Sequence, residues 1–483
     1  MAVSQARIPL PGSEITTMDD LFLKQKAAFA RVPYPTFKAR QVHLTKLIDL
    51  LIREQEAIVE AISADFGNRS QDETRTAEIM VSIEGLRYAK RRLRRWMRPD
   101  PVSVGRLMFS TRARTEYQPK GVVGIIAPWN YPLLMIIAPL TYALAAGNRV
   151  MIKPSEFTPR TSALMKKLIA ECFDDDHVSV VTGEADVGIA FAKLPFDHLL
   201  FTGSTGVGRH IMRAAAENLT PVTLELGGKS PAIISPDVDL AMAAERICFG
   251  KALNAGQTCT APDYILCPHE KLDALVEQLQ AQFAKMYPSL LNNDDYTSIV
   301  SDRQYERLQS LLHDAISKEA RVIELNPAKE KLPPESRKMP LTLVLDVHDD
   351  MTVTREEIFG PILPIVTYDH LDEAIAYINA RPRPLALNCF DSDCARIRKV
   401  LDETHSGGVC VNDTVMHVAV DDLPFGGSGE SGMGRYHGRQ GFETFSNVRG
   451  VFWRPRWLNT ARMLYPPYGG RLIRLLHKFT LKK

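Results

Sequence analysis

Four short runs indicate the fold: GVVGIIAP (121–128), RVMIKP (149–154), VSVVTG (178–183) and HLLFTG (198–203). Helix-like sequence lies between successive runs. Each run is short, apolar and rich in β-branched residues, as expected of strands that are buried on both faces. The segments between them have the length and composition of helices. This repeated alternation predicts a doubly wound, mostly parallel α/β sheet.

The first of these runs begins a stretch, residues 121–148, that contains no charged side chain and is long enough to resemble a membrane span. Three prolines interrupt it, Pro128, Pro132 and Pro139, and Asn130 lies inside it. Because prolines break a spanning helix, a buried strand, a turn and a buried helix fit the stretch better. We therefore predict no membrane span here.

The sequence on either side extends the same pattern. Residues 21–65 and 74–96 combine charged residues with apolar residues at helical spacing, which predicts helices of the outer layer. A second α/β block is expected between residues 226 and 411, with strands at PAIIS (231–235), DYILC (263–267), LTLVL (341–345) and LPIVTY (363–368).

Composition narrows the class of protein. With 483 residues, 45% hydrophobic and 24% charged, the chain is expected to form two to four folded domains. The net charge is +2, and the last 34 residues hold eight Lys or Arg and no acidic residue, so the body is mildly acidic and no nucleic-acid partner is expected. Seven scattered cysteines argue against a disulfide framework, and the N-terminus lacks a signal-peptide pattern. We therefore expect a cytoplasmic location.

A glycine-rich turn lies where the strand HLLFTG meets the next helix. Its residues Gly203, Gly206 and Gly208 expose main-chain N–H groups that favour a phosphate, although a tight strand-to-helix turn is an equal alternative. A nucleotide-binding turn calls for an acid about 20 residues on, and Glu225 follows Gly203 by 22 residues. Glu156, at the end of another strand, competes for the ribose, and spacing does not separate the two.

Cys259 is the best candidate for a nucleophile. It follows Gly256 and lies between two threonines, which leaves room for a substrate to approach the sulfur. Cys389 and Cys394 lack the spacing and the histidine partners of a zinc site, and no HExxH motif is present, so no metal site is predicted.

Seven motifs, in this order, resemble the aldehyde dehydrogenase superfamily: PWNYP (128–132), KPSE (153–156), FTGSTGVG (201–208), TLELGGKSP (223–231), GQTCTAPDYILC (256–267), EEIFGP (356–361) and LPFGGSGESGMG (423–434). WNYP, FETFS (442–446) and YPPY (465–468) resemble its class 3 branch. The chain is especially similar to the coniferyl aldehyde dehydrogenase subfamily, through ADFGNRS (64–70), DYTSIV (295–300) and DDLPFGG (421–427).

The resemblance implies a catalytic role for three residues. Cys259, as thiolate, would attack the aldehyde carbon, and the amide of Asn130 with the Cys259 main-chain N–H would stabilise the oxyanion. Hydride transfer would leave a thioester, which water activated by Glu225 would hydrolyse. Glu225 is thereby assigned to catalysis, and its presence favours hydrolytic over CoA-dependent members of the family.

The resemblance also implies a cofactor site. Glu156, with Lys153, would bind the adenosine ribose, and its carboxylate favours NAD, although NADP stays possible. The implied cofactor-binding residues are Trp129, Lys153, Glu156, Gly203, Ser204, Gly208, Glu357 and Phe359. The walls of the substrate pocket are expected at Trp129, Tyr131, Met135, Met416 and His417, which suits a coniferaldehyde-like aromatic or a medium- to long-chain aliphatic aldehyde.

The fold implied by the resemblance has two doubly wound parallel α/β domains and a β oligomerisation arm that would join a homodimer. The expected divisions are an NAD-binding domain at 1–102 and 119–226, a catalytic domain at 227–411, the arm at 103–118 and 435–454, and a basic tail at 455–483.

The basic tail allows two interpretations. Leu472, Leu475, Leu476 and Phe479 share one face of a helix whose other face is basic, so weak peripheral contact with an anionic membrane is one interpretation. The plainer one, which we favour, is a terminal helix that packs on its own dimer or frays.

Two rival functions stay open at this point. A cysteine-dependent esterase or thioesterase would need Cys259, Asn130 and Glu225 but not the nucleotide-binding residues. A non-catalytic scaffold would need none of them.

Overall fold

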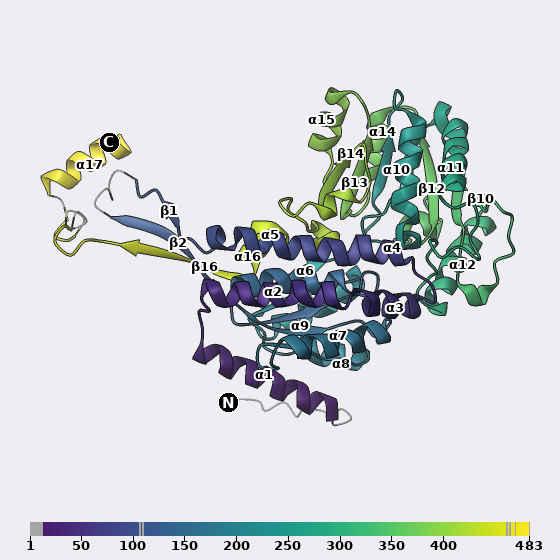
Figure 1. Cartoon of the computed structure of the whole chain (residues 1–483). Coiled ribbons are helices and arrows are strands. Elements are labelled where there is room, and N and C mark those ends of the chain that lie inside the picture. The colour runs from purple at the N-terminus through teal and green to yellow at the C-terminus, as the bar shows by residue number, and fades with distance from the viewer. Residues whose placement is uncertain are drawn as a thin grey trace, which may run out of the picture.

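The computed structural model describes residues 13–105, 108, 111–459, 462, 465–468 and 470–482, with the side chains of 13–17, 472 and 476 left out. Two open sheets with their helices make up the body, and a third sheet projects from it (Figure 1). Helix α17 (Arg471–Leu481) lies at the outer end of this projection, far from the body.

The first sheet confirms the predicted doubly wound α/β fold. Its strand order is β15-β7-β6-β3-β4-β5, parallel except for β15. The four runs that predicted it form strands β3, β4, β5 and β6. The strands of this sheet are β3 (Val122–Ile126), β4 (Arg149–Lys153), β5 (Val178–Val180), β6 (His198–Thr202), β7 (Val222–Glu225) and β15 (Gly432–Met433).

Helices cover both faces of this sheet, because successive strand residues point to opposite sides. Val123 and Ile125 pack into a core shared with α2, α3, α5, α6 and α7, whereas Val122 packs into a second core shared with α1, α8 and α9. The helices are α1 (Ser13–Arg31), α2 (Phe37–Arg53), α3 (Gln55–Phe66), α4 (Gln71–Thr74), α5 (Val81–Trp96), α6 (Leu134–Ala146), α7 (Pro159–Cys172), α8 (Ala185–Ala192) and α9 (Thr205–Ala216), with a π-helical turn at Arg75–Met80.

The uncharged stretch 121–148 folds as predicted, into strand β3, a turn and the buried helix α6. Its apolar character comes from burial inside the sheet layers. Among the described residues, none of the helices is both long and apolar enough to cross a membrane.

The second sheet follows after the chain leaves β7 and contains all four strands predicted for this block. Its order is β10-β11-β12-β9-β8-β13-β14, and β10 is its one antiparallel strand among the described residues. Its strands are β8 (Pro231–Ile234), β9 (Tyr264–Pro268), β10 (Arg321–Leu325), β11 (Leu341–Leu345), β12 (Ile362–Tyr368), β13 (Ala386–Phe390) and β14 (Gly408–Val411). Its helices are α10 (Leu240–Ala252), α11 (Leu272–Met286), α12 (Asp302–Ser317), α13 (Thr352–Arg355), α14 (Leu371–Asn379) and α15 (Cys394–Glu403).

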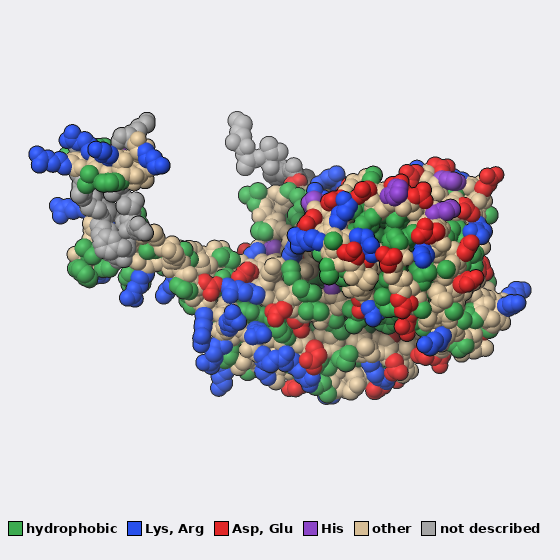
Figure 2. All heavy atoms as spheres, turned by 90° about the horizontal axis from the view of Figure 1, so that it is seen from above, with side chains coloured by type: hydrophobic (Ala, Val, Ile, Leu, Met, Phe, Trp, Pro, Cys, Tyr) green, Lys and Arg blue, Asp and Glu red, His purple; other side chains and the backbone are tan. Residues whose placement is uncertain are grey.

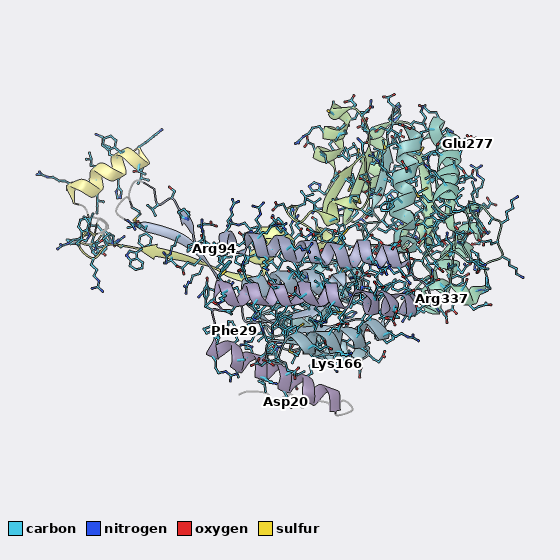
Figure 3. The ribbon with its side chains drawn as sticks, in the orientation of Figure 1. Asp20, Phe29, Arg94, Lys166, Glu277 and Arg337 are labelled. Carbon is cyan, nitrogen blue, oxygen red and sulfur yellow. The ribbon has the colours of Figure 1, made fainter. Side chains whose placement is uncertain are left out.

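Polar contacts join this half to the N-terminal helices. Arg337, labelled in Figure 3, donates to the main-chain oxygen of Phe66, at the end of α3, at 2.8 Å and to that of Ile299 at 2.8 Å. The bond to Phe66 joins the two halves near the loop that follows α3.

The projecting sheet has the order β1-β2-β16, with β1 (Asp100–Val102), β2 (Arg112–Pro119) and β16 (Ser446–Trp453). Its strands β2 and β16 come from the two segments expected for the arm, 103–118 and 435–454, and β1 precedes them. Residues 438–444, within the second segment, form helix α16 (Gly438–Thr444). Phe442 of this helix is 1% exposed and packs in the first core, so burial of its ring keeps the segment on the body. Residues 106, 107, 109 and 110 of the predicted arm lie outside the described residues.

Candidate active site

Cys259 lies in a loop between α10 and β9 that needs unusual backbone angles. Asn254 and Ala255 adopt left-handed conformations, with φ of 52° and 50°. Gly256 follows with φ of 73°, and a Cβ there would lie 2.5 Å from the main-chain oxygen of Gly360. The loop holds the thiol half-buried, and burial, together with the carboxylates of Glu357 and Glu225, raises the pKa of Cys259 to about 12.

Asn130 and Tyr131 approach this loop from the turn between β3 and α6. The Asn130 Nδ2 donates to the main-chain oxygen of Gln257 at 3.1 Å, and the Tyr131 hydroxyl lies 2.7 Å from the Thr258 Oγ1. Both contacts are buried. The two side chains therefore bind the residues that immediately precede Cys259.

Glu225 is the last residue of β7 and is 2% exposed. Its main-chain oxygen accepts from Gly203, but neither carboxylate oxygen has a hydrogen-bond partner in the described structure. Burial raises the pKa of this carboxyl well above its ordinary value, against a weaker opposing effect of Arg435. A buried carboxyl group that has a raised pKa and no hydrogen-bond donor is typical of a side chain that takes up a proton during a reaction.

The carboxyl ends of the first sheet's strands carry the predicted nucleotide-binding residues. Lys153 ends β4, and its Nζ lies 3.1 Å from the Glu156 Oε2. Ser204 caps α9 by accepting from the Val207 N–H at 3.4 Å. Gly208 has no room for a side chain, since a Cβ would lie 2.7 Å from the Leu226 Cδ2.

These features fit a dinucleotide. Gly206 and Val207 in the first turn of α9 are exposed, and Gly206 has no atom within 4 Å of the position of a Cβ, which leaves room for a pyrophosphate to approach the N-terminus of the helix. The carboxylate of Glu156 lies at the edge of a parallel sheet, where ligands of this fold class bind.

Glu357 and Phe359 meet the site from the second half of the chain. The Glu357 carboxylate lies where a Cβ of Gly227 would be, 2.1 Å from that position, and burial raises the pKa of Glu357 to about 8. Phe359 has a φ of 50°, and its ring centroid lies 5.2 Å from that of Trp129 in an edge-to-face contact.

A small cavity lies between α5, α6 and the chain segments around residues 418–421 and 436–437. Tyr436, one of its walls, is buried, and its pKa is raised first by burial and then by Glu225 and Cys259, so it lies within the field of both. The residues that line the cavity are Val81, Ser82, Gly85, Leu134, Met135, Ala138, Thr141, Tyr142, Val418, Ala419, Asp421, Tyr436 and His437.

Of the pocket walls predicted from the sequence, Met135 lines this cavity, and Tyr131 instead contacts the cysteine loop. Met416 is 49% exposed, and His417 lies 2.9 Å from the Cys410 Sγ through its Nδ1. Neither lines the cavity, so their pocket role stays a prediction. No group of three His, Cys, Asp or Glu side chains suited to a metal ion is found in the described ranges.

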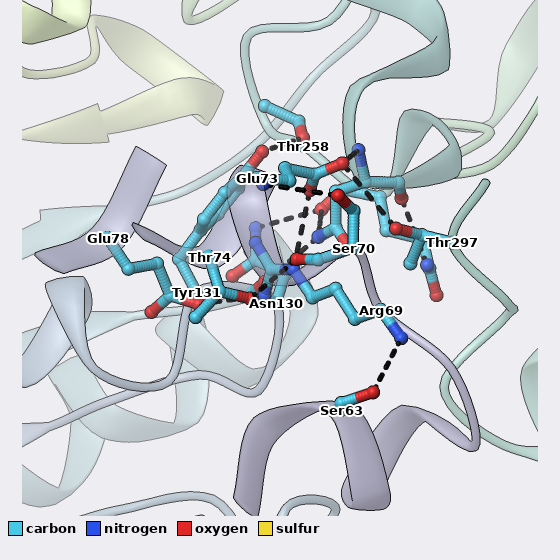
Figure 4. A network of polar contacts seen from close by, with 12 residues as sticks. Ser63, Arg69, Ser70, Glu73, Thr74, Glu78, Asn130, Tyr131, Thr258 and Thr297 are labelled. Carbon is cyan, nitrogen blue, oxygen red and sulfur yellow. Dashed lines mark hydrogen bonds and ion pairs between the residues drawn. The ribbon is translucent and has the colours of Figure 1, made fainter. Parts of the chain in front are cut away.

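Sequence reasoning missed a buried polar network around Arg69, drawn in Figure 4. Arg69 bonds Glu73, Glu78 and the main-chain oxygen of Asn130, and its side chain has no solvent exposure. The motif ADFGNRS contains this arginine, but nothing in its local pattern distinguishes it from an exposed one. Glu73 and Glu78 follow Arg69 by four and nine residues, but Asn130 comes from a distant part of the chain.

The chain is similar to known proteins over most of its length. A family model described as "Aldehyde dehydrogenase family" matches residues 10–451. A relative from Pseudomonas aeruginosa, named "Probable coniferyl aldehyde dehydrogenase", is 55% identical over 97% of both chains.

Two solved structures are similar over the whole fold. One, described as "Substrate bound state of Staphylococcus Aureus AldH", has a TM-score of 0.91 at 38% identity and covers 96% of this chain and 99% of that one. The other, an NAD+ complex of an aldehyde dehydrogenase from Bacillus cereus, has a TM-score of 0.83 at 28% identity over 92% and 90% of the two chains.

Proposed function

The chain belongs to the aldehyde dehydrogenase family, and we propose that it oxidises a coniferaldehyde-like aromatic aldehyde to its carboxylic acid with NAD as the acceptor. One observation supports this most: the amide of Asn130 bonds the loop that carries Cys259, and the buried carboxyl of Glu225, which has no hydrogen-bond partner in the described structure, acts electrostatically on the Cys259 thiol. The name of the Pseudomonas aeruginosa relative supports the aromatic substrate, and the Bacillus cereus complex supports NAD.

In the first step, the Cys259 Sγ adds to the carbonyl carbon, its proton passes to solvent, and the carbonyl oxygen becomes an oxyanion. The Asn130 Nδ2 carries two N–H groups, of which one donates to Gln257, so the second is available for the developing oxyanion. The Cys259 main-chain N–H would be the other donor. Donors placed in advance cost no reorganisation as the charge forms.

The next steps convert the adduct to acid. NAD, when bound, would supply the acceptor for the hydride of the carbon attached to sulfur, which would leave Cys259 as a thioester. Glu225 would then take a proton from water as the water oxygen attacks the thioester carbon. The C–S bond breaks, the acid leaves, and the proton passes from Glu225 to the Cys259 sulfur. A carboxyl whose pKa is raised by burial is a stronger base than an exposed one, which suits this task near neutral pH.

For the cofactor, Lys153 and Glu156 would bind the adenosine ribose and the first turn of α9, after Ser204, the pyrophosphate. Gly203 and Gly208 keep this turn close to its strand. Glu357 and Phe359, beside Trp129, would bind the nicotinamide end. Because the Glu156 carboxylate would repel a 2′-phosphate, NAD is preferred over NADP.

The test is NADH formation by the purified protein with coniferaldehyde, benzaldehyde and decanal in parallel. We expect turnover that is highest with coniferaldehyde, and a maximum with decanal would instead assign an aliphatic pocket. Cys259→Ala should be inactive, and Cys394→Ala, at an exposed cysteine, is the matched control. Hydrolysis of a nitrophenyl ester with no aldehyde oxidation would favour the esterase function.

We further infer that two copies pair through the projecting sheet. Strand β16 is one edge of this sheet and, among the described residues, pairs with β2 alone. Val448, Phe452 and Trp453 on it are more than half exposed. An exposed apolar edge strand favours pairing with another chain. Light scattering should give a dimer for the wild type and a monomer for Val448→Lys with Phe452→Lys.

The tail supports a weaker proposal, contact with an anionic membrane. Leu475, Phe479 and Leu481 of α17 are more than half exposed, and Lys and Arg side chains gather at this outer end (Figure 2). Residues 460, 461, 463, 464, 469 and 483 of the tail lie outside the described residues. Vesicle co-sedimentation with and without residues 469–483 tests it, and equal binding would exclude a role of the tail in membrane contact.

A further inference from the structure

We propose that Arg69 is a positioning residue, which holds the main chain of Asn130 and thereby places the Asn130 amide at the Cys259 loop. The proposal rests on the proposed function, in which that amide stabilises the oxyanion. Arg69 itself acts through Asn130.

The first observation is the direct contact. The Arg69 Nη1 donates to the Asn130 main-chain oxygen at 3.0 Å and to the Glu78 Oε1 at 2.8 Å (Figure 4). Its guanidinium carbon lies 4.7 Å from the centre of the Tyr131 ring. Arg69 therefore contacts both residues of the turn that reach the cysteine loop, one by a hydrogen bond and the other by stacking.

The second observation is that the same carbonyl is held from the opposite side. The Asn254 Nδ2 donates to the Asn130 oxygen at 2.9 Å, and Asn254 belongs to the loop that leads to Cys259. Glu73 joins the two donors, since its Oε1 accepts from the Arg69 Nε at 3.3 Å and its Oε2 from the Asn254 N–H at 3.0 Å. The contacts form a closed ring around the Asn130 carbonyl.

The third observation concerns the far end of the turn. The Glu78 Oε2 accepts from the main-chain N–H of Leu133 at 2.8 Å and of Leu134 at 3.0 Å, where α6 begins. Because Arg69 bonds the other oxygen of Glu78, it is connected to both ends of the segment from Asn130 to Leu134. A shift of this segment would therefore break a buried hydrogen bond to Arg69 or to Glu78.

This arrangement predicts a specific energetic coupling. If Arg69 serves only the stability of the fold, its replacement changes turnover by the same factor whether or not residue 130 carries an amide. If Arg69 positions that amide, its replacement has little further effect once the amide is gone.

The experiment is a double-mutant cycle on kcat for coniferaldehyde with NAD, with Arg69→Lys, Asn130→Ala and the double variant. Lysine is chosen because it keeps a positive charge between the carboxylates of Glu73 and Glu78. A neutral residue would leave both carboxylates without a counter-charge. We expect Asn130→Ala to lower kcat by about 10² to 10³, and Arg69→Lys to lower it by about tenfold with the KM for NAD within twofold. In the Asn130→Ala background, Arg69→Lys should change kcat by less than about twofold.

Arg40→Lys is the matched control. Arg40 is another buried arginine that donates to main-chain oxygens, those of Ala145 and Ala146 at the far end of α6. Any effect of Arg40→Lys should be the same factor in both backgrounds. Thermal unfolding of every variant reports its stability separately.

A second variant covers the case in which Arg69→Lys does not fold. Asn254→Gly removes the other donor to the Asn130 oxygen, and a φ of 52° suits glycine. In the Asn130→Ala background, Asn254→Gly should likewise change kcat by less than about twofold.

Equal factors in both backgrounds, with an active wild type, would overturn the Arg69 proposal alone. A wild type inactive on every aldehyde, with NAD still bound, would instead overturn the proposed function and this proposal with it.

Discussion

Replacement of Glu225 by Gln should separate the two halves of the reaction and change the pH dependence of stability. Glu225 is 2% exposed, and its carboxylate oxygens have no hydrogen-bond partner in the described structure. Glutamine keeps the shape and removes the titration. The variant should still give a first burst of NADH, because hydride leaves before water attacks, and then turn over 10² to 10⁴ times more slowly, roughly the contribution of a general base.

The sign of the stability effect follows from the direction of the pKa shift. Burial raises the pKa of Glu225 in the folded protein, so between the unfolded and folded pKa values the folded state holds more protons than the unfolded state. Stability is therefore lost as pH rises through this window, by up to about 1.4 kcal/mol per pH unit. Glu225→Gln lacks this loss.

The magnitude in a melting experiment is small but measurable. With about 2.1 cal/mol/K of unfolding entropy per residue, a chain of 483 residues shifts its Tm by roughly 1 °C per kcal/mol. The Tm of Glu225→Gln relative to wild type should therefore rise by about 1.4 °C for each pH unit between pH 5.5 and the folded pKa.

The matched control is Glu277→Gln, at an exposed position on α11 (Figure 3), which should leave burst, turnover and Tm unchanged. Two results would refute the reasoning. Turnover of Glu225→Gln at the wild-type rate would remove it as the base, and a Tm difference that is constant with pH would show that the carboxyl does not titrate as a buried group.

Further predictions concern the nucleophile and the ribose. Cys259→Ala should lose aldehyde oxidation and ester hydrolysis but still bind NAD, by fluorescence titration, and loss of NAD binding would contradict this. Since the pKa of Cys259 is raised to about 12 in the free protein, its alkylation by iodoacetamide, followed by mass spectrometry, should accelerate about tenfold per pH unit from pH 7 to 9; a plateau in this range would contradict the burial. Glu156→Gln should raise kcat/KM for NADP relative to NAD, and an unchanged ratio would remove Glu156 as the discriminating carboxylate.

The sequence predicted the strands well for a physical reason. A strand buried on both faces is apolar throughout, so Val122–Ile126 and Arg149–Lys153 are recognisable without any neighbour. The arm segment 435–454 was harder to divide from sequence, because it holds both strand β16 and the short helix α16, and burial of Phe442 against the core holds that helix on the body. That contact is tertiary and has no local signature.

The residues of the site also differ in whether the local sequence identifies them or only the tertiary structure does. Cys259 was identifiable from its small neighbours, and the roles of Asn130 and Glu225 came from a family resemblance. Arg69 had no such signal, because an arginine is ordinarily exposed, and only the fold brings it to Asn130, 61 residues further on.

The electrostatics of the site also order the chemistry. Burial is the main cause of the raised pKa of Cys259, and the carboxylates of Glu357 and Glu225 add to it. An ionised Glu225 would therefore oppose formation of the thiolate, whereas a protonated Glu225 would not. Because burial also raises the pKa of Glu225, its protonated form is favoured in the free enzyme, which removes that opposition while the sulfur attacks the aldehyde. Once the sulfur is held in a thioester it no longer ionises, so Glu225 can lose its proton and act as the base without opposing a thiolate.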